Sequence, residues 1–429
     1  MLVESWLHRA AAARPDHPAL ATAQGTLTYA QLLGAAAGAD VPAGLGDRVG
    51  LALPPGEPFA VALHACLLRG AVAVPIDPRL GRAERARRER GCAVVVREAL
   101  PAAPPSASAC AVPTHDLAAP AVVVHTSGST GAGTPVELTY ANWLWSALGS
   151  SVALGHPRGE RWLCALPLSH VGGLSILLRA AIGATTVILH ERFTTHPVVG
   201  ELTRPGGPTA VSLVPTMLHR LLDAGLRRPP TLRTALLGGA PGPPALLERA
   251  RDAGIPVVTT YGLTEACSQV ATAGAPLFCT RVRIADDGEV LVSGPTVAPG
   301  AADPDGWLRT GDLGELAADG TLLVTGRAAD TIVTGGENVA PSEVEAVLER
   351  HPAVVEAVVH GRPDPEWGEA VVATVVLRAE TVAAELIAHC AAHLATHQVP
   401  KAVTFATELP RTAGGKLRRR AGRLDPDSR

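Results

Sequence analysis

The chain has 429 residues, of which 47% are hydrophobic, and its formal net charge at pH 7 is −3. This length is more than one simple core needs, so we expect two or three domains. Because the charge is close to neutral, the composition gives no general attraction to nucleic acid or to a membrane surface, and we expect neither as a partner.

Cysteine usage indicates a protein with reduced thiols, as in the cytoplasm. The seven cysteines include no C-x-x-C pair and their number is odd, which argues against a disulfide framework and against a zinc site. The N-terminus has no basic segment followed by an apolar core, so we expect no signal peptide. Arginine replaces lysine almost everywhere, and the two remaining lysines, Lys401 and Lys416, become candidates for a functional role.

Helix-like and strand-like segments alternate along the chain, which is typical of α/β proteins. We expect a helix over residues 4–13, a strand over 49–54, a helix over 58–69, a strand over 71–77 and a charged helix over 84–90. The Ala- and Pro-rich stretch 99–120 is expected to be an exposed connector.

The same alternation continues beyond the connector. The most apolar stretch, Trp162 to Leu178, contains Pro167, His170 and two glycines, so we interpret it as a buried strand and loop and not as a membrane span. We then expect strands over 184–190, 234–241 and 255–262, with a helix over 214–225.

The pattern changes near Ile284 to short strands with Asp-Gly turns at 287–288 and 319–320, which predicts antiparallel pairing. After Gly326 a compact unit begins. Its first helix is predicted to have Ser342 as N-cap and Glu345 three residues later, as in a capping box. Strands over 353–361 and 370–377 and a helix over 382–393 are expected to follow.

The expected fold class is α/β, with two domains of unequal size. The large N-terminal domain, residues 1–326, would contain α/β subdomains and a short β-rich segment. A hinge at 327–330 would connect it to a small, mobile α+β domain at 331–429, which is a sensible domain size.

A Ser/Thr/Gly loop follows the β-branched run that begins at Val122. Such a loop presents many backbone N–H groups and several hydroxyls to one small volume, and its glycines allow a ligand to approach closely. It is suited to a polyphosphate, although no G-K-[ST] sequence closes it as in a Walker A loop. A plain surface turn is the alternative. The loop residues are Thr126, Ser127, Gly128, Ser129, Thr130 and Gly131.

Six further motifs follow this loop in a fixed order. They are PLSHVGG (167–173), LLGGAP (236–241), YGLTEA (261–266), RTGD (309–312), GRAADTIVTGGENVAPSEVE (326–345) and PRTAGGKLRRR (410–420). Together with the loop, this set resembles the acyl-adenylate-forming superfamily of acyl-CoA synthetases, luciferases and peptide-synthetase adenylation domains. The resemblance covers nearly the whole chain. It implies that a carboxylate attacks the α-phosphate of ATP and that pyrophosphate leaves.

The resemblance also implies where ATP binds. The Ser/Thr/Gly loop would hold the β- and γ-phosphates. Adenine would lie between Tyr261 with Gly262 and the small residues Gly238–Ala240, because small residues let a flat ring lie against the backbone. Asp312 would accept hydrogen bonds from the ribose hydroxyls, and Arg327 would lie near the ribose or a phosphate.

Four residues are implied to take part in the chemistry. Glu265 would help to hold Mg²⁺, a cation that prefers oxygen ligands, and Thr264 would contact the α-phosphate. Lys416 would offset the negative charge that develops as the carboxylate attacks. His170 would lie by the acyl pocket and the phosphates. A surface Glu, a tail Lys and a core His are the structural alternatives.

Two positions depart from the superfamily pattern. The phosphate loop usually continues to a lysine, whereas here the residues from Gly131 to Val136 include no cation. The usual hinge residue, Asp or Lys, is replaced by Ala329, and Asp330 follows it. An alanine can still absorb a backbone rotation, so we expect the domain motion of the second half-reaction to survive.

Three stretches bear on the acid: PLSHVGGLSILLRAA (167–181), SLVPTMLHRLL (212–222) and YGLTEACSQVAT (261–272). In these stretches the sequence most resembles the o-succinylbenzoate–CoA ligases of menaquinone biosynthesis. The resemblance places His170, Gly172, Gly173, Ser268 and Gln269 at the acyl pocket, where the last two are polar and would bind a second carboxylate or a ketone. It implies coenzyme A as the second substrate, with a small carboxylic acid and ATP as the first. A homodimer, and a contact of Arg418–Arg420 with CoA, stay open.

Three alternatives remain. The chain would be another aryl- or acyl-CoA ligase, a stand-alone adenylation enzyme that loads a carrier protein, or a silent nucleotide-binding homologue. The polar pair at 268 and 269 argues against a plain alkyl acid. Neither the pocket Asp nor the adjoining carrier domain of peptide-synthetase adenylation domains is evident in the sequence, so we do not expect that class. Retention of Glu265, Asp312, Arg327 and Lys416 argues against a silent protein.

Overall fold

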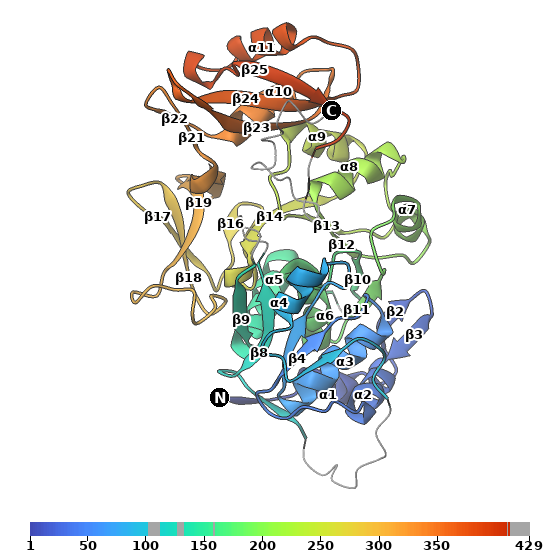
Figure 1. Ribbon diagram of the computed structural model, residues 1–429. Helices are drawn as coiled ribbons and strands as arrows, with labels where there is room; N and C mark the ends of the chain where they lie inside the picture. The colour runs from blue at the N-terminus through green and yellow to red at the C-terminus, as the bar shows by residue number, and fades with distance from the viewer. Residues whose placement is uncertain (102–111, 127–132, 158, 410, 412–429) are drawn as a thin grey trace. The chain divides into compact units, whose positions relative to one another are not determined.

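The computed structural model describes residues 1–101, 112–126, 133–157, 159–409 and 411 (Figure 1). Close contacts divide the chain into two compact units. The first unit contains Met1–Gly239, Ala250–Arg281 and Val292–Leu308, and the second contains Ala240–Arg249, Val282–Leu291 and Arg309–Arg429.

A five-stranded sheet lies in the first unit, with strand order β6-β4-β5-β8-β9. The strands β6, β4, β5 and β8 are parallel neighbours, and β9 pairs antiparallel with β8. The bounds are β4 Arg48–Leu51, β5 Val72–Pro75, β6 Val94–Val96, β8 Pro120–His125 and β9 Pro135–Thr139, with helices α3 (Glu57–Arg69) and α4 (Arg82–Arg88) between them in the chain.

Both faces of this sheet are covered, which explains its continuous apolar strands. In β8, Val122 and Val124 belong to the largest core cluster, whereas Val123 belongs to a second cluster with Val72 and Val74. Successive side chains of a strand point to opposite faces, so one β-branched run contributes to two separate layers. The end of β8 is therefore held firmly where the Ser/Thr/Gly loop begins.

A nine-stranded sheet also belongs largely to the first unit, with order β16-β15-β14-β13-β12-β10-β11-β2-β3. The strands from β14 to β2 run parallel, and both edges are antiparallel hairpins. The bounds are β2 Pro18–Thr22, β3 Gly25–Thr28, β10 Arg161–Cys164, β11 Thr186–Leu189, β12 Ala210–Leu213, β13 Thr234–Leu237, β14 Val257–Leu263, β15 Ser268–Thr272 and β16 Ala275–Pro276.

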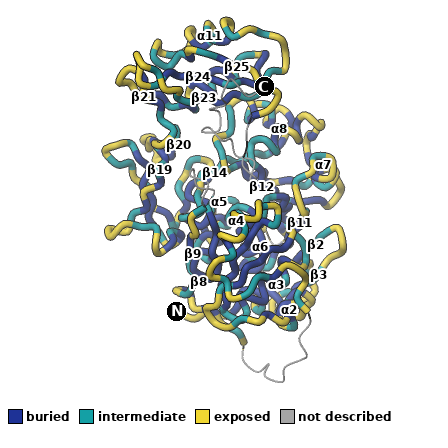
Figure 2. Tube along the Cα trace, viewed as in Figure 1, coloured by how far each residue is buried: buried dark blue, intermediate teal, exposed yellow. Residues whose placement is uncertain are grey.

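Helices pack between and against these sheets to form one large core (Figure 2). Tyr29, Trp143 and Leu174 are among its largest fully buried side chains. Thr28 and Thr139 start two of the helices with complete capping boxes, which fix where those helices begin. The bounds are α1 Trp6–Ala13, α2 Tyr29–Gly38, α5 Tyr140–Leu154, α6 Val171–Gly183, α7 Thr195–Thr203, α8 Pro215–Asp223 and α9 Pro244–Asp252.

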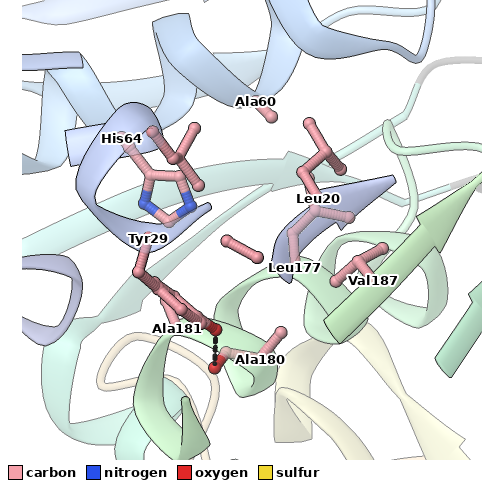
Figure 3. Close-up of a pocket in the computed structure, with 10 residues that line it drawn as sticks. Leu20, Tyr29, Ala60, His64, Leu177, Ala180, Ala181 and Val187 are labelled. Carbon is pink, nitrogen blue, oxygen red and sulfur yellow. Dashed lines mark hydrogen bonds between the residues drawn. The ribbon is translucent and has the colours of Figure 1, made fainter. Parts of the chain in front are cut away.

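Figure 3 shows a small cavity in this core, where Tyr29, His64 and Leu177 are among the lining residues. Its volume is about 10 Å³, which is room for no more than one water molecule. The Tyr29 hydroxyl donates to the Ala180 carbonyl at 2.7 Å. Burial lowers the pKa of His64 to about 4, so this histidine is a neutral core residue and the cavity is a packing feature.

A four-stranded sheet of order β17-β18-β19-β20 follows in the chain. Its bounds are β17 Arg281–Ile284, β18 Glu289–Ser293, β19 Leu308–Leu316 and β20 Leu322–Arg327. The predicted turn at 319–320 joins the antiparallel strands β19 and β20. Gly288 and Gly320 adopt φ values of 80° and 84°, the left-handed conformation that such turns require.

The second unit also contains a five-stranded sheet in which β25 pairs with β24 beside the order β22-β21-β24-β23. Helices α10 and α11 contribute Val344, Leu348 and Leu386 to its core. The bounds are β21 Ile332–Thr334, β22 Glu337–Val339, α10 Pro341–Leu348, β23 Val354–Asp364, β24 Gly368–Leu377, α11 Ala383–Ala391 and β25 Ala402–Ala406.

Three sequence predictions need correction. The interpretation of Trp162 to Leu178 as strand and loop was wrong beyond residue 170, because α6 begins at Val171. The connector over 99–120 contains a short strand, β7 (Thr114–Asp116), which pairs antiparallel with β1 (Leu2–Glu4). Local sequence preference did not predict the start of α6 or the strand β7, because both depend on packing or pairing with segments far away in the chain.

The predicted capping box of α10 was also wrong. The N-cap residue is Ala340 and it makes no side-chain cap. The Ser342 hydroxyl donates to the Thr325 carbonyl, and the Glu345 carboxylate accepts from the Val359 backbone N–H at 2.9 Å. Both side chains therefore connect the helix to neighbouring strands, and Pro341 supplies the favoured first helical residue.

Among the described residues, no helix combines the length and the apolar character needed to cross a bilayer.

We predict opposite effects for two glycine substitutions. A Cβ at Gly262 would lie 1.8 Å from the Ser268 carbonyl oxygen, so Gly262→Ala forces backbone to move and should lower the unfolding free energy by about 1–3 kcal/mol. Gly34, inside α2, has open space around its Cβ position, so Gly34→Ala should stabilise by about 0.5–1 kcal/mol. Chemical denaturation of both variants checks this, and equal stabilities would contradict it.

Candidate active site

The predicted site residues of the first unit follow the carboxyl ends of parallel strands. Ligands of α/β proteins commonly bind at this edge of a sheet. Thr126 follows β8, His170 follows β10 and Gly238 follows β13. The topology therefore explains why short motifs that are far apart in the chain all lie at the carboxyl ends of parallel strands.

The motifs LLGGAP and YGLTEA lie side by side because β13 and β14 are parallel neighbours. The Gly238 N–H donates to the Leu213 carbonyl at 3.1 Å, and a Cβ at Gly238 would lie 2.7 Å from the Thr260 methyl group. Gly239 has φ 80°. The two glycines thus allow a close backbone turn next to the strand that carries Tyr261, which is half-buried.

A sharp reversal follows Tyr261. Gly262 and Leu263 end β14, the 3-10 turn η1 spans Thr264–Ala266, and β15 returns antiparallel from Ser268. Cys267 and Ser268 have φ values of 52° and 94°, a left-handed conformation that is unfavourable for residues with a side chain. Strain of this kind persists only where surrounding structure holds it, and it is concentrated at functional sites.

Glu265 lies in this reversal with its side chain half-buried. Its backbone carbonyl accepts from Ala298 at 2.8 Å, but no described side chain pairs with its carboxylate. The described residues contain no group of three or more His, Cys, Asp or Glu arranged to hold a metal. A single carboxylate fits Mg²⁺, which keeps several waters and takes further oxygen ligands from phosphates.

His170 is the residue that precedes α6, and its side chain makes no cap hydrogen bond. Burial lowers the pKa of His170, and the positive charges of Arg88 and Arg79 lower it further, while Asp77 opposes them. The imidazole is therefore neutral near pH 7. It can accept or donate one hydrogen bond, but it does not supply a positive charge.

Asp77 and Arg79 are two residues near His170 that the sequence analysis missed. Arg79 donates to both carboxylate oxygens of Asp77, from Nε at 2.9 Å and from Nη2 at 2.8 Å. Burial favours protonation of Asp77, but the hydrogen bonds from Arg79 outweigh it and lower the pKa of Asp77. The sequence clue is the Asp-Pro-Arg that follows a buried strand at its carboxyl end.

The paired glycines of PLSHVGG lie in the first turn of α6. A Cβ at Gly173 would lie 2.5 Å from the Pro167 carbonyl oxygen, so this turn packs directly against the preceding loop. Gly172 is less crowded, with the Leu166 side chain 3.7 Å from its Cβ position. Gly173 is therefore required for packing, because any side chain there would collide with the backbone of the preceding loop.

Gln269 is fully buried, and Ser268 beside it is half-buried. The Gln269 side chain accepts from Arg179 Nη2 at 3.3 Å and donates to Thr272 Oγ1 at 3.0 Å. The Ser268 hydroxyl makes no hydrogen bond to the described residues. Gln269 therefore connects β15 to a buried arginine of α6.

Arg179 is the most unusual polar residue of the first unit and was missed by the sequence analysis. It is only 6% exposed, and its guanidinium carbon lies 4.5 Å from the centre of the Trp162 ring. Its Nε and Nη1 have no hydrogen-bond partner among the described residues. Burial lowers the pKa of Arg179 to about 10, yet the group stays charged at neutral pH.

The negative charge of Glu160 acts on Arg179 and opposes the effect of burial, but Glu160 forms its ion pair with another arginine. Glu160 is buried, and its Oε1 accepts from Arg233 Nη2 at 2.6 Å. No ion pair connects Arg179 to a carboxylate within the described part of the chain. A buried cation with unused donors is costly unless an anion binds to it. The sequence clue was an arginine directly after the most apolar stretch of the chain, followed by further apolar residues.

The phosphate loop is described only at its two ends. The Thr126 N–H donates to the Thr134 carbonyl at 2.9 Å, and the Thr134 N–H donates to Thr126 Oγ1 at 3.2 Å. These bonds continue the β8–β9 hairpin. Residues Ser127, Gly128, Ser129, Thr130 and Gly131 lie outside the described residues, as does Lys416.

In the second unit, Asp312 and Arg327 are directly opposite each other on β19 and β20. Arg327 Nε lies 2.8 Å from Asp312 Oδ1, and the aspartate side chain is only 8% exposed. The expected hinge residues Ala329 and Asp330 form the 3-10 turn η2 (Ala328–Asp330) directly after β20. The candidate ribose and hinge residues are thus neighbours in one segment.

The six described cysteines form no disulfide. Burial raises the pKa of Cys66 and of Cys164 to about 12, so both are inert thiols near neutral pH. The chemistry of the site depends on carboxylates, amides and cations.

Comparison with known proteins identifies the family. The AMP-binding enzyme family matches residues 7–97 and 92–301, and the AMP-binding enzyme C-terminal domain matches residues 343–416. The 2-succinylbenzoate–CoA ligase of Bacillus licheniformis is 37% identical, over 97% of this chain and 98% of its own length. The corresponding ligase of Bacillus subtilis is 35% identical, over 98% of both chains.

Solved structures agree with the sequence relatives. The o-succinylbenzoate CoA synthetase (MenE) of Bacillus subtilis, in complex with the acyl-adenylate intermediate OSB-AMP, matches with a TM-score of 0.90 at 33% identity and covers 99% of each chain. The same enzyme in complex with ATP and magnesium ion matches with a TM-score of 0.89 at 34% identity, over 98% of this chain and 99% of that chain. The predicted α/β fold and superfamily are confirmed, and the chain belongs to the AMP-binding enzyme family, among relatives that are 2-succinylbenzoate–CoA ligases.

Proposed function

We propose that this protein is a 2-succinylbenzoate–CoA ligase. In the first half-reaction a carboxylate of 2-succinylbenzoate attacks the α-phosphate of ATP, and pyrophosphate leaves. In the second, the CoA thiol attacks the acyl-adenylate, and AMP leaves. The observation that supports the substrate assignment is the buried guanidinium of Arg179 beside Gln269, of which two nitrogens have no hydrogen-bond partner among the described residues.

The substrate has two carboxylates, of which only one reacts. The other stays charged and must find a cation when it leaves water. Arg179 offers two nitrogens without partners, Nε and Nη1. Gln269 accepts from the third nitrogen, and Trp162 gives an aromatic surface next to them. A plain alkyl or benzoate-like acid would leave this guanidinium buried and unpaired, so the arrangement favours a dicarboxylic aromatic acid.

For the adenosine part of ATP, Tyr261 and Gly262 are proposed to line one side of the adenine ring, and Gly238, Gly239 and Ala240 the other. The paired glycines support this because their close turn exposes flat backbone beside β14. Asp312 accepts from the ribose hydroxyls, and Arg327, its ion-pair partner, holds the carboxylate in place. Gly172 and Gly173 are assigned to the entrance of the acyl pocket.

Charge neutralisation dominates the first half-reaction, because the transition state carries several negative charges. The loop of Thr126 to Gly131 holds the leaving phosphates, and Thr264 donates to the α-phosphate. Glu265 would hold Mg²⁺, which supplies positive charge to the phosphate oxygens when bound. Lys416 approaches the attacking carboxylate and the α-phosphate. His170, which is neutral, orients the acid through a hydrogen bond and adds no charge.

The second half-reaction is proposed to follow a rotation about residues 327–330, between domains at 1–326 and 331–429. The turn η2 suits a hinge because it is short, and because Ala329 is exposed and Asp330 is half-buried. ATP and CoA as substrates are consistent with a reaction in the cytoplasm, and 2-succinylbenzoate as the acid is consistent with menaquinone biosynthesis. We also propose that the protein assembles as a homodimer. Light scattering of the purified protein would measure the molar mass in solution and so test this.

Identifying the products that the protein forms from a panel of acids tests the proposal directly. Purified protein with Mg·ATP, CoA and the panel should form 2-succinylbenzoyl-CoA and AMP, read by mass spectrometry. A CoA ester of a different acid would keep the reaction class and overturn the substrate. Acyl-AMP without thioester would point to impaired rotation at Ala329, or to an acceptor other than CoA.

The role of Arg179 is tested with two acids and Arg179→Met. The variant loses the cation but keeps a similar length of side chain, so kcat/KM for 2-succinylbenzoate should fall by about 30-fold or more, since an unpaired buried charge costs about 2–5 kcal/mol. The value for 3-benzoylpropionate, which lacks the ring carboxylate, should change little. Arg161→Gln is the control, because Arg161 bonds only backbone carbonyls. Equal losses for both acids would contradict the assignment.

The two lysines of the chain provide a matched test of catalysis. Lys416→Ala should reduce acyl-AMP formation by about 100-fold or more, as expected for loss of a charge-stabilising group. Lys401→Ala, which removes only a cation that lies 4.9 Å from the exposed Trp367 ring, should retain the rate. The rate of acyl-AMP formation is measured from pyrophosphate release before the steady state. A decrease of less than tenfold for Lys416→Ala would remove its assigned role.

A further inference from the structure

A line of buried side chains crosses the core of the first unit on both sides of Arg179. On one side, Trp162 Nε1 donates to Ser212 Oγ at 3.0 Å, and the guanidinium carbon of Arg179 lies 4.5 Å from the centre of the Trp162 ring. On the other side, Arg179 Nη2 donates to Gln269 Oε1 at 3.3 Å, and Gln269 Nε2 donates to Thr272 Oγ1 at 3.0 Å. All five side chains are buried. The guanidinium is therefore held between a ring and an amide, and one hydroxyl anchors each of them.

Thr272 decides which way the Gln269 amide points. A glutamine amide has an acceptor oxygen on one side and an NH2 donor on the other, and a half-turn exchanges them with little change of shape. Here the oxygen faces Arg179 and the NH2 group faces the threonine hydroxyl. The opposite orientation would place the NH2 group against a guanidinium N–H, donor against donor. Removal of the Thr272 hydroxyl would therefore take away the acceptor that holds the amide in place, at a cost in free energy for the buried donor.

Ser212 fixes the Trp162 ring in a corresponding way. Strands β10 and β12 are parallel neighbours, in which Trp162 is opposite Ala210. Ser212 is two residues beyond Ala210, so its side chain points to the same face of the sheet as that of Trp162. A cation is attracted to the face of an indole ring, which is negative, and not to its positive edge. The hydrogen bond to Ser212 holds the one polar group of the ring and so fixes the surface that Arg179 contacts.

We propose that Thr272 and Ser212 are positioning residues for the acid site, and that they set its preference for acids with a second carboxylate. In the proposed function, on which this role rests, Arg179 binds that carboxylate. Arg179 Nε and Nη1 have no partner among the described residues, and their directions follow from where Gln269 holds Nη2 and where the Trp162 ring lies. Donors that are already oriented bind a carboxylate more tightly than donors on a side chain that must first be ordered. The two hydroxyls act through Gln269 and Trp162 and not by contact with the acid.

Steady-state kinetics of the full-length protein with two acids test this role. Thr272→Val keeps the shape of the side chain and removes the hydroxyl, so kcat/KM for 2-succinylbenzoate should fall by about tenfold, since a buried donor loses its acceptor. The loss should be in KM and not in kcat, because the carboxylate that Arg179 binds is not the one that reacts. The value for 3-benzoylpropionate, which lacks the ring carboxylate, should be unchanged. Thr272→Ser restores a hydroxyl and should recover the wild-type ratio of the two values, and Ser212→Ala should show the same selective loss as Thr272→Val.

Thr186→Val is the matched control. Thr186 is a buried threonine on β11 of the same sheet, and its hydroxyl donates to the Pro18 carbonyl at 2.7 Å. Its removal should leave the ratio of kcat/KM for the two acids unchanged. Equal losses for both acids with Thr272→Val, or failure of Thr272→Ser to recover the ratio, would show a purely structural role and overturn the proposal.

The wild-type protein separates failure of this proposal from failure of the proposed function. Absence of 2-succinylbenzoyl-CoA with the wild-type protein contradicts the proposed function. Crystal structures of Thr272→Val and Ser212→Ala then decide the positioning role, because Gln269 and Trp162 should turn in these variants and Arg179 should move with them. Side chains that stay in their wild-type positions would overturn it.

Discussion

The reversal of the nine-stranded sheet at residues 263–268 is the constraint on which the candidate site depends. Gly262 packs against the Ser268 carbonyl so closely that a Cβ cannot fit, and Cys267 and Ser268 take left-handed backbone conformations. This geometry changes a parallel strand into an antiparallel one within a few residues. It leaves Thr264 and Glu265 in the turn and directs Gln269 into the core.

The segment from Tyr261 to Gln269 therefore contributes to both the proposed nucleotide site and the proposed acid site. Before the turn, Tyr261 lies beside the glycines that end β13, where a nucleotide is proposed to bind. After the turn, Gln269 contacts Arg179, where the second carboxylate is proposed to bind. Because both ends are part of one sheet, the distance between the two sites is fixed by backbone hydrogen bonds and not by flexible loops.

Electrostatics divides the first unit into regions with different tasks. Arg79 and Asp77 satisfy each other, and His170 beside them is neutral, so that region positions groups without a net charge. Arg179 keeps its charge in an apolar surrounding, where we propose that it binds the second carboxylate of the acid. A cavity beside α4 gathers several arginines around one carboxylate. The low cationic content of the phosphate loop, which lacks a lysine, makes these other positive groups more important for binding anions.

The sequence by itself determined the superfamily, the alternation of strands and helices and the identity of most candidate nucleotide residues. Those features are local, since short motifs and strand periods are written in consecutive residues. It did not determine that α6 begins at Val171, that Glu345 bonds to Val359, or that Arg179 contacts Gln269 in the core. Only the tertiary structure decided these, because burial, ion pairing and the absence of a partner depend on segments far apart in the chain.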